Sequence, residues 1–567
     1  MSAFDLVIRG GTVVDGTGAA PFKADVAVKD GKIAAVGEGL GTGAEEIDAA
    51  GMIVTPGFVD IHTHYDGQVT WDNRLAPSSY HGVTTAVIGN CGVGFAPCKP
   101  ENREGLVRLM EGVEDIPFPV LTEGLPWTWT TFPEYLDFLA ARPYDMDIAA
   151  YLPHAALRVY VMGARGENRE PATAEDIAEM QRLLGEALDA GALGLATSRT
   201  IFHRSSDGRS IPTLDASDAE LVALAEVLKA KGKGVFQIVE DIHMPGATLN
   251  SMRKIAETAQ RPLTFSIGAG NSGPQVWPEL LKQLGEANAS GLMMKGQLMP
   301  RGIGMILGFE LTLNPFYTTS TYQELVKLPL EQRLQELRKP EVRAAILGEP
   351  LDPDPALVLG RMVREFDTMF LLGETPDYEQ PPERSIAAMA AARGVTPEEL
   401  AYDIMIEGKD GGKLYLAMAN YTDGSLDTVG KILEHPDVVL GLGDGGAHVG
   451  TICDASYSTF ALMHWVRDRK TGAKPLEDIV HRMTGATADV VGLSDRGRIA
   501  PGLRADLNVI DLPNLALKEP EVHYDLPSGG RRLIQEAKGY RATILRGQFV
   551  SRDDKPTGDL PGHLIRI

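Results

Sequence analysis

Short apolar runs recur through the middle of the chain and alternate with segments of helical periodicity. One helical segment begins with cap chemistry at Thr173 and keeps apolar residues three to four positions apart as far as Leu188. Another begins in the same manner at Ser217. Eight strands separated by helices predict an α/β fold of the (β/α)8 TIM-barrel type. The eight apolar runs lie near residues 58–62, 84–90, 148–152, 192–197, 234–239, 262–267, 292–298 and 438–443.

The two ends of the chain have a different pattern, in which apolar-rich runs are broken by tight-turn signals. In the first fifty residues, DLVIRGGTVVDG and DVAVKDGKIAAVG contain Gly-Gly and Asp30-Gly31. Similar runs return near the other end in ADLNVID and YRATILRGQFV. We therefore expect one small β-sandwich domain assembled from both termini. Its parts would be residues 1–56 and 491–567, with the barrel over residues 57–490.

The interval from residue 299 to 437 is too long for a single barrel connection. It contains NPFYTTSTY, a charged helical stretch from Leu328 to Leu347 and further helices between residues 385 and 420. We expect an insertion that could form a lid over the barrel mouth. Tyr317 lies in this insertion and could contact substrate if the segment closes over the site.

Composition and charge exclude some partners. The 567 residues are 44% hydrophobic and 23% charged, as in a globular protein with a large core. The formal net charge of −23 argues against nucleic acid or an anionic membrane as the main partner. Three cysteines are too few for a disulfide framework, and neither a signal peptide nor a membrane span is apparent. We expect a cytoplasmic protein, and association into a homo-oligomer remains open.

The stretch GFVDIHTHYD places two imidazoles, His62 and His64, on one face at the end of a predicted strand. In a barrel, active-site groups lie at the carboxyl ends of the strands. Cys91 follows the second predicted strand and Asp444 follows the eighth. Two nitrogens, a thiolate and a carboxylate are the ligand types of zinc. The sequence therefore predicts that these four side chains hold a zinc ion.

Each of these residues also has a simpler structural explanation. A His-x-His pair is common by chance, and a lone cysteine after a strand is more often a small buried apolar residue. An aspartate followed by two glycines is usually a turn former. Their common position at predicted strand ends favours the metal site over these alternatives.

Several segments together carry a resemblance to a known family: PGFVDIHTHYD, VIGNCGVGFAP, LGLGDGGAH, GRIAPGLRADLNVID and the closing TGDLPGHLIR. The sequence resembles the N-acyl-D-amino-acid deacylase (D-aminoacylase) family of the amidohydrolase superfamily. The resemblance implies a barrel with a β-sandwich from both termini and amide hydrolysis with one or two Zn²⁺ ions. It implies metal-binding roles for His62, His64 and Cys91 and a catalytic role for Asp444.

Two strands depart from that family's pattern. Members typically place a metal-binding histidine on the fifth strand and another on the sixth. Here the fifth strand reads GVFQIVED and the sixth reads PLTFSIGAG, neither with a histidine. We expect the metal to lie instead toward His62, His64 and Asp444, with Cys91 completing the ligand set. The alternative is a weakened site.

Three further residues are candidates for substrate binding. Arg199, after the fourth strand, could hold a substrate carboxylate in a bidentate manner. His203, in the same loop, is either a ligand or proton donor or an ordinary surface residue. His448, four residues after Asp444, or His203 could stabilise a developing oxyanion.

The expected reaction is hydrolysis of an N-acyl amino acid or a related small amide. Zinc would activate water and polarise the carbonyl, while Asp444 would accept the proton of water and pass it to the leaving nitrogen. Barrel loops host many chemistries, so a cyclic amide, lactone, carbamate or small peptide remains an alternative substrate. A non-catalytic scaffold is a further alternative, which the missing histidines support and the joint presence of His62, His64, Cys91 and Asp444 argues against.

Overall fold

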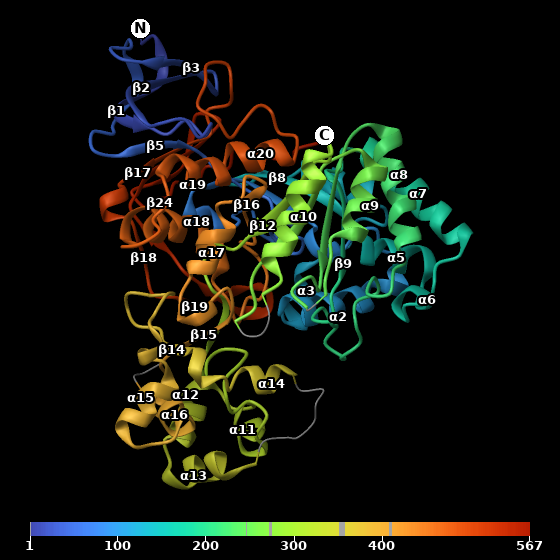
Figure 1. Ribbon diagram of the computed structural model, residues 1–567, viewed down its shortest axis with the longest axis vertical. Coiled ribbons are helices and arrows are strands. Elements are labelled where there is room, and N and C mark those ends of the chain that lie inside the picture. Colours follow the sequence, from blue (N-terminus) through green and yellow to red (C-terminus); the bar gives the residue numbers. More distant parts are fainter. Residues whose placement is uncertain (1, 245, 272–274, 351–357, 408–410) are drawn as a thin grey trace.

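Eight parallel strands form the curled sheet of a TIM-type barrel in the computed structural model (Figure 1), which describes residues 2–244, 246–271, 275–350, 358–407 and 411–567. Each predicted apolar run forms one strand. Backbone hydrogen bonds from Asp444 N to His62 O (3.1 Å) and from His64 N to Gly445 O (2.8 Å) join the two ends of the sheet. In spatial order the strands are β16 (Val438–Leu440), β12 (Met294–Leu298), β11 (Leu263–Ile267), β10 (Val235–Glu240), β9 (Gly194–Arg199), β8 (Asp147–Pro153), β7 (Val83–Ile88) and β6 (Phe58–Asp60).

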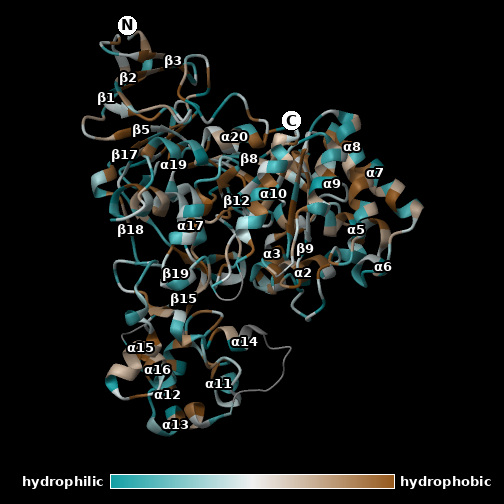
Figure 2. Ribbon diagram, in the orientation of Figure 1, coloured by the Kyte–Doolittle hydropathy of each residue, from teal (hydrophilic) through white to brown (hydrophobic). Residues whose placement is uncertain are grey.

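Helices cover the outside of the barrel where the periodicity predicts them. Helix α7 (Ala174–Asp189) begins with a capping box in which Thr173 and Asp176 bond reciprocally. Helix α8 (Asp218–Lys231) begins with the Ser217 hydroxyl accepting from Glu220 N. Figure 2 shows hydrophobic residues along strands such as β9 and hydrophilic residues on the outer helices. The other barrel helices include α2 (Arg103–Glu114), α3 (Phe118–Gly124), α4 (Phe132–Ala140), α5 (His154–Met162), α6 (Ala164–Glu167), α9 (Asn250–Ala259), α10 (Trp277–Ala289), α17 (Asp427–Ile432), α19 (Leu476–Met483) and α20 (Gly485–Val490).

A bilayer-spanning helix would need a long, uniformly apolar stretch. Among the described residues, no helix reaches both that length and that hydropathy.

Both ends of the chain contribute strands to one nine-stranded sheet, blue and red in Figure 1. The two halves meet where β5 and β17 pair antiparallel, with Thr55 opposite Asn508. This confirms that the terminal segments assemble together, while the sandwich arrangement and the domain limits at residues 56 and 490 stay predictions. The strands are β1 (Phe4–Val13), β2 (Phe22–Lys29), β3 (Lys32–Gly37), β4 (Gly43–Asp48), β5 (Ile53–Pro56), β17 (Leu507–Ile510), β22 (Tyr540–Leu545), β23 (Gln548–Arg552) and β24 (Lys555–Pro556).

The segment between β12 and β16 folds around a hydrophobic core of its own, yellow in Figure 1. It adjoins the loop that follows β16, because Ile306 N donates to Thr451 O (2.6 Å) and Thr312 N donates to Gly450 O (3.3 Å). An insertion next to the barrel mouth is thus observed, and its closure as a lid stays a prediction. Its elements are β13 (Ile303–Leu307), α11 (Ser320–Leu325), α12 (Leu330–Leu337), α13 (Pro340–Gly348), α14 (Val358–Met362), β14 (Met369–Leu371), α15 (Ile386–Arg393), α16 (Pro397–Ile406) and β15 (Leu414–Ala419).

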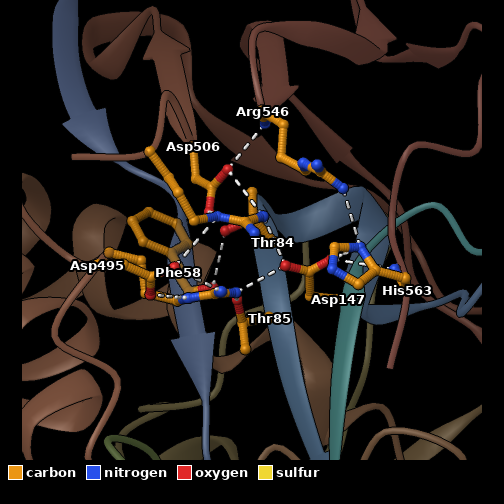
Figure 3. A network of polar contacts seen from close by, with 10 residues as sticks. Phe58, Thr84, Thr85, Asp147, Asp495, Asp506, Arg546 and His563 are labelled. Carbon is orange, nitrogen blue, oxygen red and sulfur yellow. Dashed lines mark hydrogen bonds and ion pairs between the residues drawn. The ribbon is translucent and has the colours of Figure 1, made fainter. Parts of the chain in front are cut away.

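A buried ionic network fastens the terminal sheet and the C-terminal tail to the amino end of the barrel (Figure 3). Asp147, at the start of β8, accepts hydrogen bonds from Arg496 (2.7 Å), Arg504 (2.5 Å) and the backbone N–H of His563 (3.0 Å). Burial alone would raise the pKa of Asp147. A hydrogen bond from the His563 side chain, whose Nδ1 lies 3.2 Å from Asp147 Oδ1, and the charges of Arg504 and Arg496 instead lower that pKa to about 2. Asp147 is therefore an ionised carboxylate that links three segments distant in sequence.

We expect Asp147→Asn to lower the free energy of unfolding by about 3 kcal/mol, because Arg496 and Arg504 then lose a buried carboxylate. The folded pKa lies below the ordinary value of about 3.9. This contribution is therefore fully present above pH ~4 and is lost as the pH falls toward the folded pKa. Denaturant unfolding at pH 7 measures it, with the exposed Asp559→Asn as control. A variant as stable as the wild type would contradict the proposed role of the network.

Candidate metal centre

Three of the predicted ligands converge at the carboxyl ends of the first two barrel strands. His62 and His64 follow β6 and are both buried, with their ring centroids 5.4 Å apart. Cys91 follows β7, and its Sγ lies 3.4 Å from His62 Nε2. One donor atom from each of the three residues lies within 4.8 Å of the other two. The alternation of side chains along β6 and its extension therefore delivers both imidazoles to one point, as the sequence predicts.

Asp444 reaches the same point from the loop after β16. Its Oδ1 lies 3.5 Å from His62 Nε2 and 3.6 Å from His64 Nε2. Tetrahedral zinc with ligand bonds of about 2.0–2.3 Å requires donor atoms roughly 3.3–3.8 Å apart. The separations that involve His62 Nε2 and Asp444 Oδ1 fall in this range, so the arrangement has the dimensions of a zinc site.

The protonation states of His62 and Asp444 suit a cation, whereas the carboxylates around His64 raise its pKa, so a bound cation would have to displace a proton from that ring. Burial lowers the pKa of His62 to about 4 and raises the pKa of Cys91 to about 11. Burial would raise the pKa of Asp444 as well, but the hydrogen bond from His64 and the charges of His62 and His64 lower it to about 2. A neutral imidazole and an ionised carboxylate are ready ligands, and a bound cation would favour the thiolate form of Cys91. The donor set therefore fits a divalent metal ion.

Two buried glutamines orient these ligands. Gln297, on β12, has its Oε1 2.7 Å from His62 Nδ1, so a proton on Nδ1 leaves His62 Nε2 free for a cation. Gln237, on the fifth barrel strand β10, accepts the backbone N–H of Cys91 through its Oε1 at 2.9 Å. Gln237 Nε2 and Gln297 Nε2 are among the buried side-chain atoms that lack a hydrogen-bond partner in the described part of the chain. Because buried polar atoms rarely lack partners, this cluster has the character of a site built to receive a ligand.

Glu114, the last residue of α2, adds a carboxylate that the sequence reasoning missed. Its side chain is 2% exposed, with Oε1 3.2 Å from His64 Nδ1 and Oε2 3.7 Å from His448 Nε2. A carboxylate on the far nitrogen of a ligating histidine fixes the ring and raises its basicity. Glu114 thus places a carboxylate against Nδ1 of His64, while Nε2 of the same ring lies 3.6 Å from Asp444 Oδ1. It sits at a helix end within a long connection, where no strand-end position marks it in the sequence.

Two of the predicted substrate-binding residues lie beside the cluster. His203 Nδ1 is 2.9 Å from Ser198 Oγ on β9. Burial, reinforced by the charges of His64 and His448, lowers the pKa of His203 to about 3, so its imidazole is neutral. His448 lies at the mouth with its side chain 38% exposed. Both are placed where they could meet a substrate, and their roles stay predictions.

The other two predicted residues are not brought to the cluster. Arg199 is ion-paired with Glu240 and with Asp218 (2.7 Å). Side chains alternate along β9, so Ser198 faces the interior while Arg199 faces the helical layer. Its guanidinium is already occupied by carboxylates, which corrects the expectation that it is available to a substrate. Tyr317 is half-buried against the core of the insertion, and no contact joins it to the cluster in the described part of the chain.

We expect Cys91→Ala to remove most of the bound zinc from protein that has been loaded and dialysed, because the site loses its thiolate. Elemental analysis measures the metal content. The matched control is Cys98→Ala, because Cys98 is also buried but its Sγ bonds to Lys99 O (3.3 Å). Equal zinc content in the two variants would mean that Cys91 is a packing residue and not a metal ligand.

Removing the negative charge of Glu114 should weaken the site without removing a ligand. We expect Glu114→Gln to lower zinc affinity about 10- to 100-fold, since His64 loses its orienting carboxylate. Competition with a chelator measures the affinity. Glu104→Gln, at the exposed start of the same helix, should leave it unchanged. Wild-type affinity in the Glu114 variant would rule out the positioning role.

Comparison with known proteins agrees with this geometry. The Amidohydrolase family matches residues 45–551. An uncharacterised protein of Mycobacterium tuberculosis is 29% identical over 596 residues, covering 96% of this chain and 92% of that protein. The D-aminoacylase of Alcaligenes xylosoxydans xylosoxydans is 27% identical over 571 residues, covering 99% of this chain and 97% of the relative.

A solved structure of D-aminoacylase, a protein described as having a binuclear metal centre, superposes with a TM-score of 0.66 at 25% identity. The two structures cover 100% of each other. The resemblance to the D-aminoacylases thus extends over the whole chain, as the sequence motifs predict. The chain belongs to the amidohydrolase family and is a hydrolase of amide carbon–nitrogen bonds other than typical peptide bonds.

Proposed function

We propose that this protein is a zinc-dependent hydrolase that releases an amino acid from an N-acyl amino acid. The observation that carries the proposal is the gathering of His62, His64, Cys91 and Asp444 at the carboxyl end of the barrel. Imidazole and thiolate donors together favour zinc over magnesium or calcium. The similarity to D-aminoacylase over nearly the full length of both chains supports the substrate class.

The chemistry follows from the protonation states of the chain's own residues. Zinc at this site would supply a Lewis acid that polarises the substrate carbonyl and makes water more acidic. Asp444, with its pKa near 2, is ionised and can accept the proton of the attacking water. The oxygen of water bonds to the acyl carbon, the carbon–nitrogen bond breaks, and Asp444 returns the proton to the leaving nitrogen. The products are a carboxylate and an amine.

Two histidines are placed to assist at the oxyanion. His448 stands at the mouth with its Nε2 3.7 Å from Glu114 Oε2, where its ring could donate a hydrogen bond to the oxyanion. His203 is neutral and is held by Ser198, so it suits a hydrogen-bonding role better than a charged one. The loops after β9 and β16 would thus flank the substrate carbonyl.

The central test is Asp444→Asn assayed with N-acetyl-D- and N-acetyl-L-amino acids. We expect turnover to fall about 10²–10⁴-fold, because the base is lost while both imidazoles and the thiolate remain. Zinc content should mostly survive, and Asp559→Asn should retain full activity. A fully active Asp444 variant would remove the aspartate from the mechanism.

A panel of alternative substrates tests the reaction class. It contains a cyclic amide, a lactone, a carbamate and a dipeptide, assayed beside the N-acyl amino acids at equal concentration. We expect the N-acyl amino acids to give the highest kcat/KM. Turnover restricted to one of the other compounds would replace the proposed substrate while leaving the metal site intact.

A further inference from the structure

An open cleft of about 340 Å³ lies next to the metal centre. Two of its walls continue directly from residues of that centre, since Asp115 follows Glu114 and Gly450 lies two residues after His448. Val449 lines both this cleft and the cavity beside Asp444. Other lining residues are Thr312 of the insertion and Tyr524 and Arg531 near the C-terminus. A molecule bound at Asp444 could therefore extend into the cleft.

The C-terminal wall is a hairpin of β19 (Glu521–Leu526) and β20 (Gly530–Ile534). Three contacts fix it in place around the cleft. Leu533 N donates to Val449 O (2.6 Å) in the loop after β16. Tyr524 donates its hydroxyl to Glu310 of the insertion (3.1 Å), and the turn residue Ser528 bonds to Glu123 of α3. The hairpin is thus anchored to the loop after β16, to the insertion and to α3.

Arg531 differs from the other arginines near the barrel mouth. Arg532 is paired with Asp525 (2.8 Å) and Arg301 with Asp454 (2.6 Å). The half-buried Arg531 has a side chain that forms no hydrogen bond and no ion pair with any residue that the structure describes. Asp115, in the same cleft, is occupied by the backbone N–H of Gly450 (3.2 Å). The cleft therefore presents an unpaired guanidinium in a chain whose net charge is −23.

We propose that Arg531 forms a carboxylate-binding subsite for the amino-acid part of the substrate. The proposal rests on the proposed function, because an N-acyl amino acid carries a carboxylate close to its scissile amide. A guanidinium binds a carboxylate through two parallel hydrogen bonds, which fixes orientation as well as position. Arg531 takes the role that the sequence assigned to Arg199. The carboxylate comes from either the α-carbon or an acidic side chain, and the test separates the two.

The kinetic test compares wild type, Arg531→Ala and Arg531→Lys on three substrates. N-acetylalanine has an α-carboxylate, N-acetylisoasparagine has only a side-chain carboxylate, and N-acetylalaninamide has neither. We expect Arg531→Ala to lower kcat/KM about 10- to 100-fold for a carboxylate substrate and to leave the amide unchanged. Arg531→Lys should recover part of the loss. The substrate whose kcat/KM falls in Arg531→Ala identifies which carboxylate is bound.

Arg541→Ala, which removes an exposed arginine of the terminal sheet, should leave all three substrates unaffected. An equal loss on the amide and the carboxylate substrates would mean that Arg531 only supports the fold. No loss on any substrate would overturn the subsite outright.

A binding measurement separates the subsite from the proposed reaction. Isothermal titration calorimetry with N-acetylalanine, on zinc-loaded Asp444→Asn protein with and without Arg531→Ala, needs no turnover. We expect Arg531→Ala to weaken binding about 10- to 100-fold. If the wild type hydrolyses no N-acyl amino acid but binding still depends on Arg531, the subsite is supported and the proposed function is rejected. Binding that does not depend on Arg531 overturns the subsite, whether or not hydrolysis occurs.

Discussion

The closure of the barrel between β6 and the segment after β16 is the constraint on which the site depends. Two backbone hydrogen bonds, Asp444 N to His62 O and His64 N to Gly445 O, tie these segments together. They bring a carboxylate from residue 444 against imidazoles nearly four hundred positions earlier in the chain. Without these two hydrogen bonds, His62 and His64 would remain neighbours after one strand. The carboxylate of Asp444 would then no longer lie close enough to bind the same cation.

Around this closure of the barrel, each proposed ligand contacts a partner from a different strand or helix. Gln297 fixes the ring of His62, Gln237 fixes the backbone at Cys91, and Glu114 places a carboxylate 3.2 Å from His64 Nδ1. The amides of Gln237 and Gln297 extend the set of orienting groups rather than the set of metal ligands. The fifth strand therefore still contributes to the centre, although it carries no histidine. On our proposal, these amides position the remaining donor groups of a centre whose fifth and sixth strands carry no histidine.

Much of the fold and of the candidate metal centre could be predicted from periodicity and from the position of residues at strand ends. The eight strands, the caps at Thr173 and Ser217 and the convergence of His62, His64 and Cys91 follow from local rules that tertiary packing does not override. Arg199 shows where such reasoning fails, because a shift of one residue on a strand moves a side chain from the interior to the helical layer. Glu114 and Arg531 lie on a helix and a hairpin whose place at the mouth is set by contacts distant in sequence. No pattern within either segment reveals that position.

The most direct test of the metal centre is the anomalous diffraction of a zinc-loaded crystal, measured on both sides of the zinc absorption edge. The account predicts a strong anomalous peak between His62 Nε2, His64, Cys91 Sγ and Asp444 Oδ1, at bonding distance from at least three of them. A fully loaded crystal with no peak there, or with its zinc held by other residues, would contradict it.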